Sequence, residues 1–372
     1  MKVPFYDATR EYSLYKSEFD KAIANVITSG AFILGKQVHD FEEAVCRYTG
    51  AKYAVGVANG SDALVIACDI LDLKQDAEII TPVFTFFAST SCIVRTGGKP
   101  VFCDVEEDTF NMDIKDAESR ITGKTKGIIP VHLFLQTAEM TACMELAKKH
   151  SLAVLEDAAE AFGMRTMFNG ECVHAGLIGD FGIFSFFPTK TLGGYGDGGM
   201  IVTNSEELYQ KAKSYRVHGT TKKYYHDYVG YNSRLDTLQA AILNVKLTHI
   251  DNAIQKRARH AAQYRQMLED IPGIKLPLIK AENKEVNYVF CIQAEKRDEL
   301  QEYLKSKEIG TSVYYPVPLH LQKCFEYLGH KKGDFPIAEK LCKTALALPM
   351  FPELTENEVS FVCESIKEFV IK

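Results

Sequence analysis

The chain lacks the features by which membrane, secreted and nucleic-acid-binding proteins are usually known. None of the apolar runs in its 372 residues is long enough to span a membrane, and residues 1–19 contain no apolar core of signal-peptide length. No run of lysine and arginine forms a basic arm, and the net charge of −6 gives no support for nucleic-acid binding. These absences predict a cytoplasmic protein that contacts neither nucleic acid nor membrane.

The cysteines and histidines also lack the spacings of a framework or a metal site. Ten cysteines are scattered without a C-x-x-C pair, and the ten histidines show no metal-ligand spacing. In a long chain expected in the cytoplasm, such cysteines are typical of small buried apolar side chains. We therefore expect no disulfide framework and no bound metal.

The length and composition predict a two-domain globular protein. A chain of 372 residues exceeds the usual size of a single core, while 46% hydrophobic and 25% charged residues are ordinary values. A long helical pattern covers residues 234–268, and a smaller α/β region follows it. We place the domain boundary inside that helix, which gives a large domain over residues 1–250 and a small one over residues 251–372.

Segments that favour strands alternate with segments that favour helices through the first half of the chain. The helical segments include residues 11–30, 62–71 and 140–150. The strand segments are residues 52–59, 77–82, 99–105, 126–134, 152–158, 181–187 and 198–204. This alternation predicts an α/β fold with a mostly parallel seven-stranded sheet between helices, and ligands bind such sheets beyond the carboxyl ends of the strands. The smaller region favours a strand at 286–293, a helix near 297–307, an extended segment at 311–318 and a final helix.

One lysine stands in an unusual sequence, "SFFPTKTLGGYGDGG", residues 185–199. Lys190 follows an apolar strand and precedes a loop with five glycines, which indicates that something approaches the backbone closely. A lysine is ordinarily a solvated surface charge. A desolvated lysine, however, has a lowered pKa, which suits Schiff-base chemistry with an aldehyde. We therefore predict a reactive Lys190.

Other polar residues follow strands in the same way. Asp157 ends a predicted buried strand, where it could cap a helix, pair with a cation or hold a protonated heterocycle nitrogen. Gly60 and Ser61 open a predicted helix after a strand, which makes either an anion site or an ordinary capped helix start. Ser185 could reach the same anion, and Phe86 could stack on a planar ring or belong to the core.

A dinucleotide-binding fingerprint also occurs in the glycine-rich loop. Residues 194–199, "GYGDGG", match G-x-G-x-x-G. That fingerprint requires a helix directly after the glycines, whereas "MIVTN" at 200–204 favours a strand. The match is therefore accidental, and it does not support a dinucleotide-binding oxidoreductase.

Taken together, these motifs resemble the sugar-nucleotide aminotransferases of the DegT/DnrJ/EryC1/StrS group, which have the fold-type I pyridoxal phosphate architecture. The resemblance runs nearly from end to end and includes "SGAFILGKQVHDFEEAV", "NGSDAL", "PVHLFLQ", "EDAAEAFG", "GDFGIFSFFPTKTLGGYGDGGMIVTN", "GYNSRLDTLQAAIL" and "YYPVPLHLQ". It implies an aminotransferase that carries nitrogen from glutamate or glutamine to a nucleotide-linked keto-sugar. "VPFYD", "GAFILG" and "NGSDAL" look more like members that aminate carbon 3 than carbon 4.

The resemblance also implies a role for each matching residue. Lys190 would bind pyridoxal 5'-phosphate, leave it as pyridoxamine 5'-phosphate after the first half-reaction, and move the proton. The remaining cofactor contacts would be Asp157 at the ring nitrogen, Glu160 at the ring hydroxyl, Phe86 on the ring face, and Gly60, Ser61 and Ser185 at the phosphate. Members of the group are typically homodimers, so that Asn232 would reach the neighbouring subunit's phosphate and Arg234 would border that shared site. The predicted sugar contacts are Tyr314, Tyr315 and His320; packing or loop capping is the open alternative for His320.

Two positions depart from the family pattern, and two alternative functions stay open. Glu160 replaces the common glutamine, and Leu135 replaces a common glycine beside Gln136. A sugar dehydratase of the same family lacks the Schiff-base lysine, so Lys190 argues against that alternative. A regulator that binds the cofactor without catalysis is the other alternative, and the acidic chain carries no appended DNA-binding segment.

Overall fold

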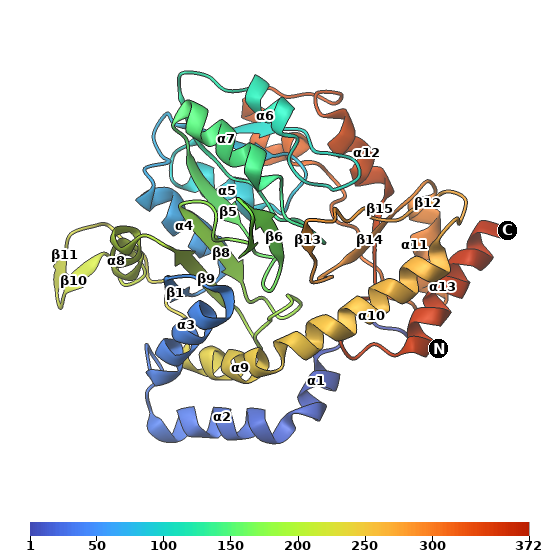
Figure 1. Ribbon diagram of the computed structural model, residues 1–372, viewed down its shortest axis with the longest axis horizontal. Coiled ribbons are helices and arrows are strands. Elements are labelled where there is room, and N and C mark those ends of the chain that lie inside the picture. The colour runs from blue at the N-terminus through green and yellow to red at the C-terminus, as the bar shows by residue number, and fades with distance from the viewer. Residues whose placement is uncertain (372) are drawn as a thin grey trace.

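A computed structural model describes residues 1–371 and centres on a seven-stranded sheet (Figure 1). The strand order is β1-β9-β8-β5-β4-β2-β3, and β9 pairs antiparallel with both of its neighbours while the other pairs run parallel. The strands are β1 Tyr53–Val57, β2 Glu78–Pro82, β3 Lys99–Cys103, β4 Thr125–Ile128, β5 Ala153–Asp157, β8 Phe181–Ser185 and β9 Gly199–Thr203. Each lies within or next to its predicted segment, so the predicted sheet is confirmed.

The sheet is buried on both faces because alternate residues of its strands pack into different apolar clusters. On β9, Met200 and Val202 belong to one cluster and Ile201 to the other. The helices around the sheet are α3 Lys36–Thr49, α4 Gly60–Ile70, α5 Ala88–Arg95, α6 Ile114–Ser119, α7 Met140–His150 and α8 Glu206–Tyr215. Residues of α3 pack in the first cluster, and those of α4, α5 and α8 pack in the second. This layering explains why the strand segments are almost continuously apolar.

The C-terminal part forms its own three-stranded sheet and apolar cluster. The sheet consists of β12 Ile274–Lys275, β14 Phe290–Ala294 and β15 Ala345–Leu348. Its helices are α10 Ile250–Leu268, α11 Arg297–Ser306, α12 Pro336–Thr344 and α13 Glu356–Ile371. The predicted strand, helix and final helix occur as β14, α11 and α13. The segment at 311–318 forms no regular strand; a single bridge at Ser312 pairs it with β15.

Short elements complete the chain. Two hairpins project from the main sheet: β6 Arg165–Phe168 with β7 Glu171–His174, which β13 Asn283–Lys284 extends, and β10 Thr220–Lys222 with β11 Tyr225–His226. The second hairpin extends far from the body of the molecule (Figure 1). Two 3₁₀ turns, Leu319–Leu321 and Lys323–Leu328, precede α12. Among the described residues, no helix is both long enough and apolar enough to cross a bilayer.

Two predicted long helices are each broken. The N-terminal one divides at Tyr15 into α1 Ala8–Leu14 and α2 Lys16–Ser29, and the later one divides at His249 into α9 Thr237–Thr248 and α10. The rings of Tyr15 and His249 stack at 3.8 Å between centroids, so the two breaks meet. The apolar face expected along one N-terminal helix is therefore split, and Leu14 is 58% exposed. Periodicity cannot locate such breaks because it continues through them.

The N-terminal helix is tied to the C-terminal helix by a two-pronged ion pair, and this yields a stability prediction. Arg10 donates to both carboxylate oxygens of Glu358, at 2.8 and 2.7 Å. The Arg10 hydrogen bonds lower the pKa of Glu358 from 4.5 to about 2. A lowered folded pKa means that the stabilisation is complete above pH 4.5 and is lost as the pH falls toward 2. Glu358→Gln should reduce the free energy of unfolding by roughly 1.5–3 kcal/mol at pH 7.

Urea unfolding of both proteins at pH 7 and at pH 3 measures this effect. The difference between Glu358→Gln and the unmodified chain should shrink at the lower pH, because at pH 3 the carboxylate of the unfolded chain, with its ordinary pKa of 4.5, binds a proton that the folded state does not. The exposed Glu302→Gln substitution, at a carboxylate that is 72% exposed, is the matched control and should change little. An equal difference at the two pH values would contradict the assigned pair.

Candidate active site

The main cavity of the site, about 420 Å³ in volume, lies at the carboxyl ends of the parallel strands. Residues that follow β1, β2, β5 and β8 line it together with residues of the C-terminal part. Nine predicted site residues meet there: Gly60, Ser61, Phe86, Asp157, Glu160, Ser185, Lys190, Tyr314 and Tyr315. Separate stretches of sequence are thus brought to one edge of one sheet.

Lys190 lies in the turn that follows β8, and only 15% of its side chain is exposed. Its ammonium nitrogen lies 3.1 Å from the Glu160 carboxylate and 4.5 Å from the centre of the Tyr288 ring. Burial favours the neutral amine, but Glu160, Tyr288 and Asp157 stabilise the charged form and raise the pKa of Lys190 above its ordinary value. The prediction of a lowered pKa is therefore wrong for the cavity as it stands, because the lysine has a partner of opposite charge.

The glycines after Lys190 serve the packing of the chain itself. A Cβ atom at Gly193 would lie 2.3 Å from the carbonyl oxygen of Pro188, and one at Gly199 would lie 2.4 Å from the carbonyl carbon of Asn59. Both contacts are closer than any side chain permits. The close approach predicted from the sequence is therefore between two parts of the chain, and it brings the start of β9 against the start of α4.

Asp157 ends β5 and is 4% exposed. It accepts hydrogen bonds from the Ser89 hydroxyl at 2.6 Å and the Ala159 N–H at 3.1 Å. Burial raises the pKa of Asp157, while these hydrogen bonds and Lys190 act in the opposite direction. No helix begins at residues 158–164, so Asp157 is not a helix cap. Asp157 is therefore a buried acid that lines the cavity.

The first turn of α4 faces Ser185 at one end of the cavity. The N-cap Asn59 accepts from the N–H of Asp62, and its carbonyl accepts from that of Ala63. The N–H groups of Gly60 and Ser61 precede these, so the helix itself supplies no partner for them. A Cβ atom at Gly60 would lie 2.8 Å from the Ser185 Cβ. Only glycine here leaves room for a helix N-terminus and the Ser185 hydroxyl to share one anion.

Aromatic side chains form the remaining walls. Phe86, which is 59% exposed, lies at the open side of the cavity. Tyr315 lies behind it, with ring centres 6.5 Å apart, and Tyr314 adjoins Tyr315 at 5.6 Å. Burial raises the pKa of both tyrosine hydroxyls, so they act as neutral hydrogen-bonding groups. A flat ring could therefore enter beside Phe86 with polar groups at both ends.

Three predicted site residues lie outside the cavity of this chain. Asn232 is exposed and accepts a hydrogen bond from Arg234 beside the base of the β10–β11 hairpin. His320 is 1% exposed, pairs with Glu339 at 3.1 Å and packs edge-on against Phe335. Of the two roles left open for His320, this position favours packing.

The departure at Leu135 lies away from the cavity as well. Leu135 is buried among apolar residues, and Gln136 hydrogen-bonds to the main chain of Leu278 and Lys280. The left-handed conformation in this turn falls at Phe134, with φ 61°, so that position 135 needs no glycine. Neither Leu135 nor Gln136 belongs to the lining of the cavity, so the departure at position 135 does not reshape the cavity walls directly.

Two functional contacts were missed by the sequence analysis. Ser89 fixes Asp157 from the first turn of α5, and Tyr288 lies 98 positions beyond Lys190 in the stretch before β14. The stretch "ASTSC" offers several hydroxyl groups and no sign of which one faces inward. These residues are identified only by their contacts in the structure, Ser89 with Asp157 and Tyr288 with Lys190.

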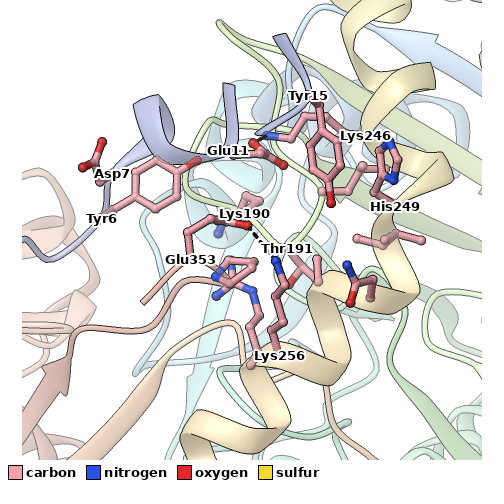
Figure 2. A pocket seen from close by; sticks show the side chains of 16 residues that line it. Tyr6, Asp7, Glu11, Tyr15, Lys190, Thr191, Lys246, His249, Lys256 and Glu353 are labelled. Carbon is pink, nitrogen blue, oxygen red and sulfur yellow. Dashed lines mark ion pairs between the residues drawn. The ribbon is translucent and has the colours of Figure 1, made fainter. Parts of the chain in front are cut away.

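A second cavity, of about 20 Å³, lies beside residues 190–192, and Figure 2 shows the charged side chains around it. Ion pairs link Lys246 to Glu11 at 2.6 Å and Lys256 to Glu353 at 3.5 Å. This volume holds about one water molecule. The cluster joins the N-terminal segment, the α9–α10 junction and the segment before α13 behind Lys190.

A lysine, a buried acid and a helix N-terminus that meet at the carboxyl edge of this sheet fit a pyridoxal phosphate enzyme of fold-type I. The chain belongs to the DegT/DnrJ/EryC1/StrS aminotransferase family, which it matches over residues 14–367. The predicted fold class, family and cofactor are thereby confirmed.

Named relatives agree over nearly the whole length. The chain is 39% identical to the UDP-N-acetyl-3-dehydro-alpha-D-glucosamine 3-aminotransferase of Acidithiobacillus ferrooxidans, over 98% of this chain and 97% of that one. It is 48% identical to a pleiotropic regulatory protein of Geobacillus stearothermophilus, over 99% of both. The crystal structure of Streptomyces venezuelae DesV with a ketimine intermediate superposes with a TM-score of 0.96, at 37% identity over 100% of this chain and 99% of that one.

Proposed function

We propose that this protein is a pyridoxal phosphate-dependent aminotransferase that aminates a nucleotide-linked keto-sugar. The observation that carries the proposal is the convergence of Lys190, Asp157 and the first turn of α4 on one cavity. The activity named for the Acidithiobacillus relative supports it and favours carbon 3 as the position of amination. Glutamate or glutamine is the proposed donor.

The residues present fit the cofactor. Gly60, Ser61 and Ser185 would hold the phosphate, and Phe86 would cover the ring. Asp157, fixed by Ser89, would keep the ring nitrogen protonated, and Lys190 would bind the aldehyde carbon and move a proton beside it. When bound, the cofactor supplies an electron sink for the carbon next to the transferred nitrogen. Tyr314 and Tyr315 would contact the sugar.

We also propose a homodimer in which Asn232 and Arg234 complete the neighbour's site. Both residues lie near the surface; the adjoining β10–β11 hairpin presents Tyr224, 82% exposed, and the segment that follows it presents Val229, 93% exposed. Exposed apolar groups of this kind mark interaction surfaces.

The division near residue 250, at the α9–α10 junction, remains our proposal for the domain boundary. A cytoplasmic location is consistent with ten free cysteines.

Product analysis tests the function directly. The purified protein is incubated with α-¹⁵N-glutamate or α-¹⁵N-glutamine and a panel of nucleotide-linked 3-keto and 4-keto sugars, and the products are examined by mass spectrometry. We expect ¹⁵N in one 3-keto-derived product. Incorporation only into 4-keto sugars would move the position of amination, and no incorporation into any sugar would overturn the proposal.

Mixed dimers test the shared site. Lys190→Ala and Asn232→Ala subunits, each inactive as homodimers, should recover about a quarter of wild-type activity after subunit exchange, since half of the random dimers carry one intact site. Mass spectrometry of the intact dimers verifies the mixing. Absence of recovery in verified heterodimers would show that Asn232 does not serve the neighbouring site.

A regulatory function is the second candidate, because the Geobacillus relative bears a regulatory name. The half-reaction separates the two. An aminotransferase converts the bound cofactor to its amine form when glutamate or glutamine is added, with loss of the yellow absorbance of the lysine-bound form. A regulator that only binds the cofactor leaves that absorbance unchanged.

A further inference from the structure

Glu160 makes the closest charged contact to the reactive lysine. Its Oε1 atom lies 3.1 Å from Lys190 Nζ, and both side chains are largely buried, with 9% and 15% exposed. An ion pair in such a place is little screened by solvent or salt. An amide at position 160 could accept a hydrogen bond from Lys190 but would offer no charge to it.

The Glu160 carboxylate is fixed on its other side as well. Its Oε2 atom accepts the N–H of Phe134 at 3.0 Å. The turn that carries Phe134 is itself anchored by His132, whose N–H donates to the Asp157 carbonyl at 3.0 Å and whose ring pairs with buried Glu156 at 2.9 Å. Glu160 therefore cannot turn away from Lys190 without losing a buried hydrogen bond.

Charged and titratable groups surround Lys190 on both sides. Those in the main cavity are Glu160, Asp157, Asp197, Tyr288, Tyr314 and Tyr315. Those around the rear cavity are Tyr6, Asp7, Glu11, Tyr15, Lys246, His249, Lys256, Arg257 and Glu353. At the rear the carboxylates Glu11 and Glu353 are already paired with lysines. Glu160 is hydrogen-bonded to the Lys190 ammonium itself, and it raises the pKa of Lys190 against the effect of burial.

We propose that Glu160 holds Lys190 in the protonated, unreactive state while the cavity is free of cofactor, so that loss of this proton limits cofactor capture. The nitrogen of an ammonium group has no free electron pair. Lys190 must therefore release one proton to solvent before its nitrogen bonds the aldehyde carbon; the aldehyde oxygen then leaves as water as the carbon–nitrogen double bond forms. Glu160 is a positioning residue that sets the pH at which this amine becomes available.

Reactivity of Lys190 in the cofactor-free protein tests the proposal. The protein is treated with formaldehyde and cyanoborohydride over a range of pH, and methylation of each lysine is quantified by peptide mass spectrometry. Burial alone would make Lys190 react at lower pH than Lys36, which is 81% exposed and whose ion pair with Asp40 is screened by solvent; the buried ion pair with Glu160 should make Lys190 react at higher pH. In Glu160→Gln the half-reaction pH of Lys190 should fall by about 1–3 units.

Asp197→Asn is the matched control, since it removes another carboxylate of the same cavity and should leave the Lys190 curve in place. At pH 7, Glu160→Gln apoprotein should also capture pyridoxal phosphate about tenfold faster for each unit by which the pKa falls. Superimposable Lys190 curves for the wild type and Glu160→Gln would overturn the proposal. Should Glu160→Gln not fold, the wild-type curve decides alone: a Lys190 midpoint below that of Lys36 would overturn it.

The inference rests on the proposed function only for the identity of the aldehyde. Methylation needs neither pyridoxal phosphate nor a sugar substrate. If Glu160→Gln shifts the Lys190 curve but the protein transfers no amino group, the role of the ion pair is supported and the proposed enzyme function is wrong. If the curves are superimposable but amino transfer is normal, the role of the ion pair is wrong and the proposed function is supported.

Discussion

Replacement of Lys190 by alanine is expected to lower turnover by a factor of about 10⁴ or more, since proton transfer by a positioned base alone contributes 10²–10⁴. The substitution removes both the amine that binds the cofactor and the group that moves the proton. The protein should stay folded, because the residue lies in a turn at the cavity, and should retain some cofactor through the first turn of α4 and Asp157. Steady-state kinetics on the product identified in the sugar panel measures the loss.

Borohydride reduction of the wild type provides the control. It should fix the cofactor to a single tryptic peptide that contains Lys190, and the Lys190→Ala protein should carry no covalent label. A label on another lysine, or substantial turnover by Lys190→Ala, would remove Lys190 from its assigned role.

Replacement of Asp157 by asparagine should lower turnover by a factor of roughly 10²–10⁴, because loss of one partner from a buried charged pair costs about 3–5 kcal/mol. Asparagine keeps the size of the side chain and can still accept the Ser89 hydroxyl, so the fold should persist. It cannot supply the negative charge that would keep the ring nitrogen protonated. Kinetics of the half-reaction with glutamate, together with the affinity for the cofactor, separates this loss from simple failure to bind.

Ser89→Ala is the matched variant for this experiment. It removes the 2.6 Å hydrogen bond to Asp157 but keeps the carboxylate, so a loss of about tenfold is expected. If Asp157→Asn turned over within tenfold of the wild type, Asp157 would serve only to shape the turn after β5.

The parts of the structure that follow from local pattern were predicted well. Strands β8 and β9 are buried on both faces of the sheet, and their almost continuous apolar sequences predict this burial. The strand after "GYGDGG" could be recognised from "MIVTN" alone, and it excluded the dinucleotide fingerprint correctly. Site residues at strand ends, such as Asp157 and Lys190, follow from the same rule that places ligands beyond the carboxyl ends.

The parts that depend on contacts between distant residues could not be predicted. The break at His249 depends on Tyr15, which is more than 230 positions away. The protonated state of Lys190 depends on Glu160, and burial alone suggested the opposite direction of the pKa shift. His320 has the residue type of a sugar contact, yet its pairing with Glu339 is invisible in the sequence. Residue type and position after a strand predicted which residues line the site. The contacts between those residues, which set their protonation and their partners, could be seen only in the structure.

The attachments of the N-terminal segment have a consequence for how the protein is made. Val3 bonds to the main chain at Glu308 and Gly310, and Arg10 bonds to Glu358. A ribosome that adds about 5–20 residues per second therefore exposes the first ten residues for roughly 18–70 seconds before their partners emerge. Throughout that time the wall behind Lys190 is missing, since Glu11 and Glu353 both belong to it. The small cavity behind Lys190 is thus among the last parts of the molecule to form, after the central sheet and after every residue that lines the main cavity has been synthesised.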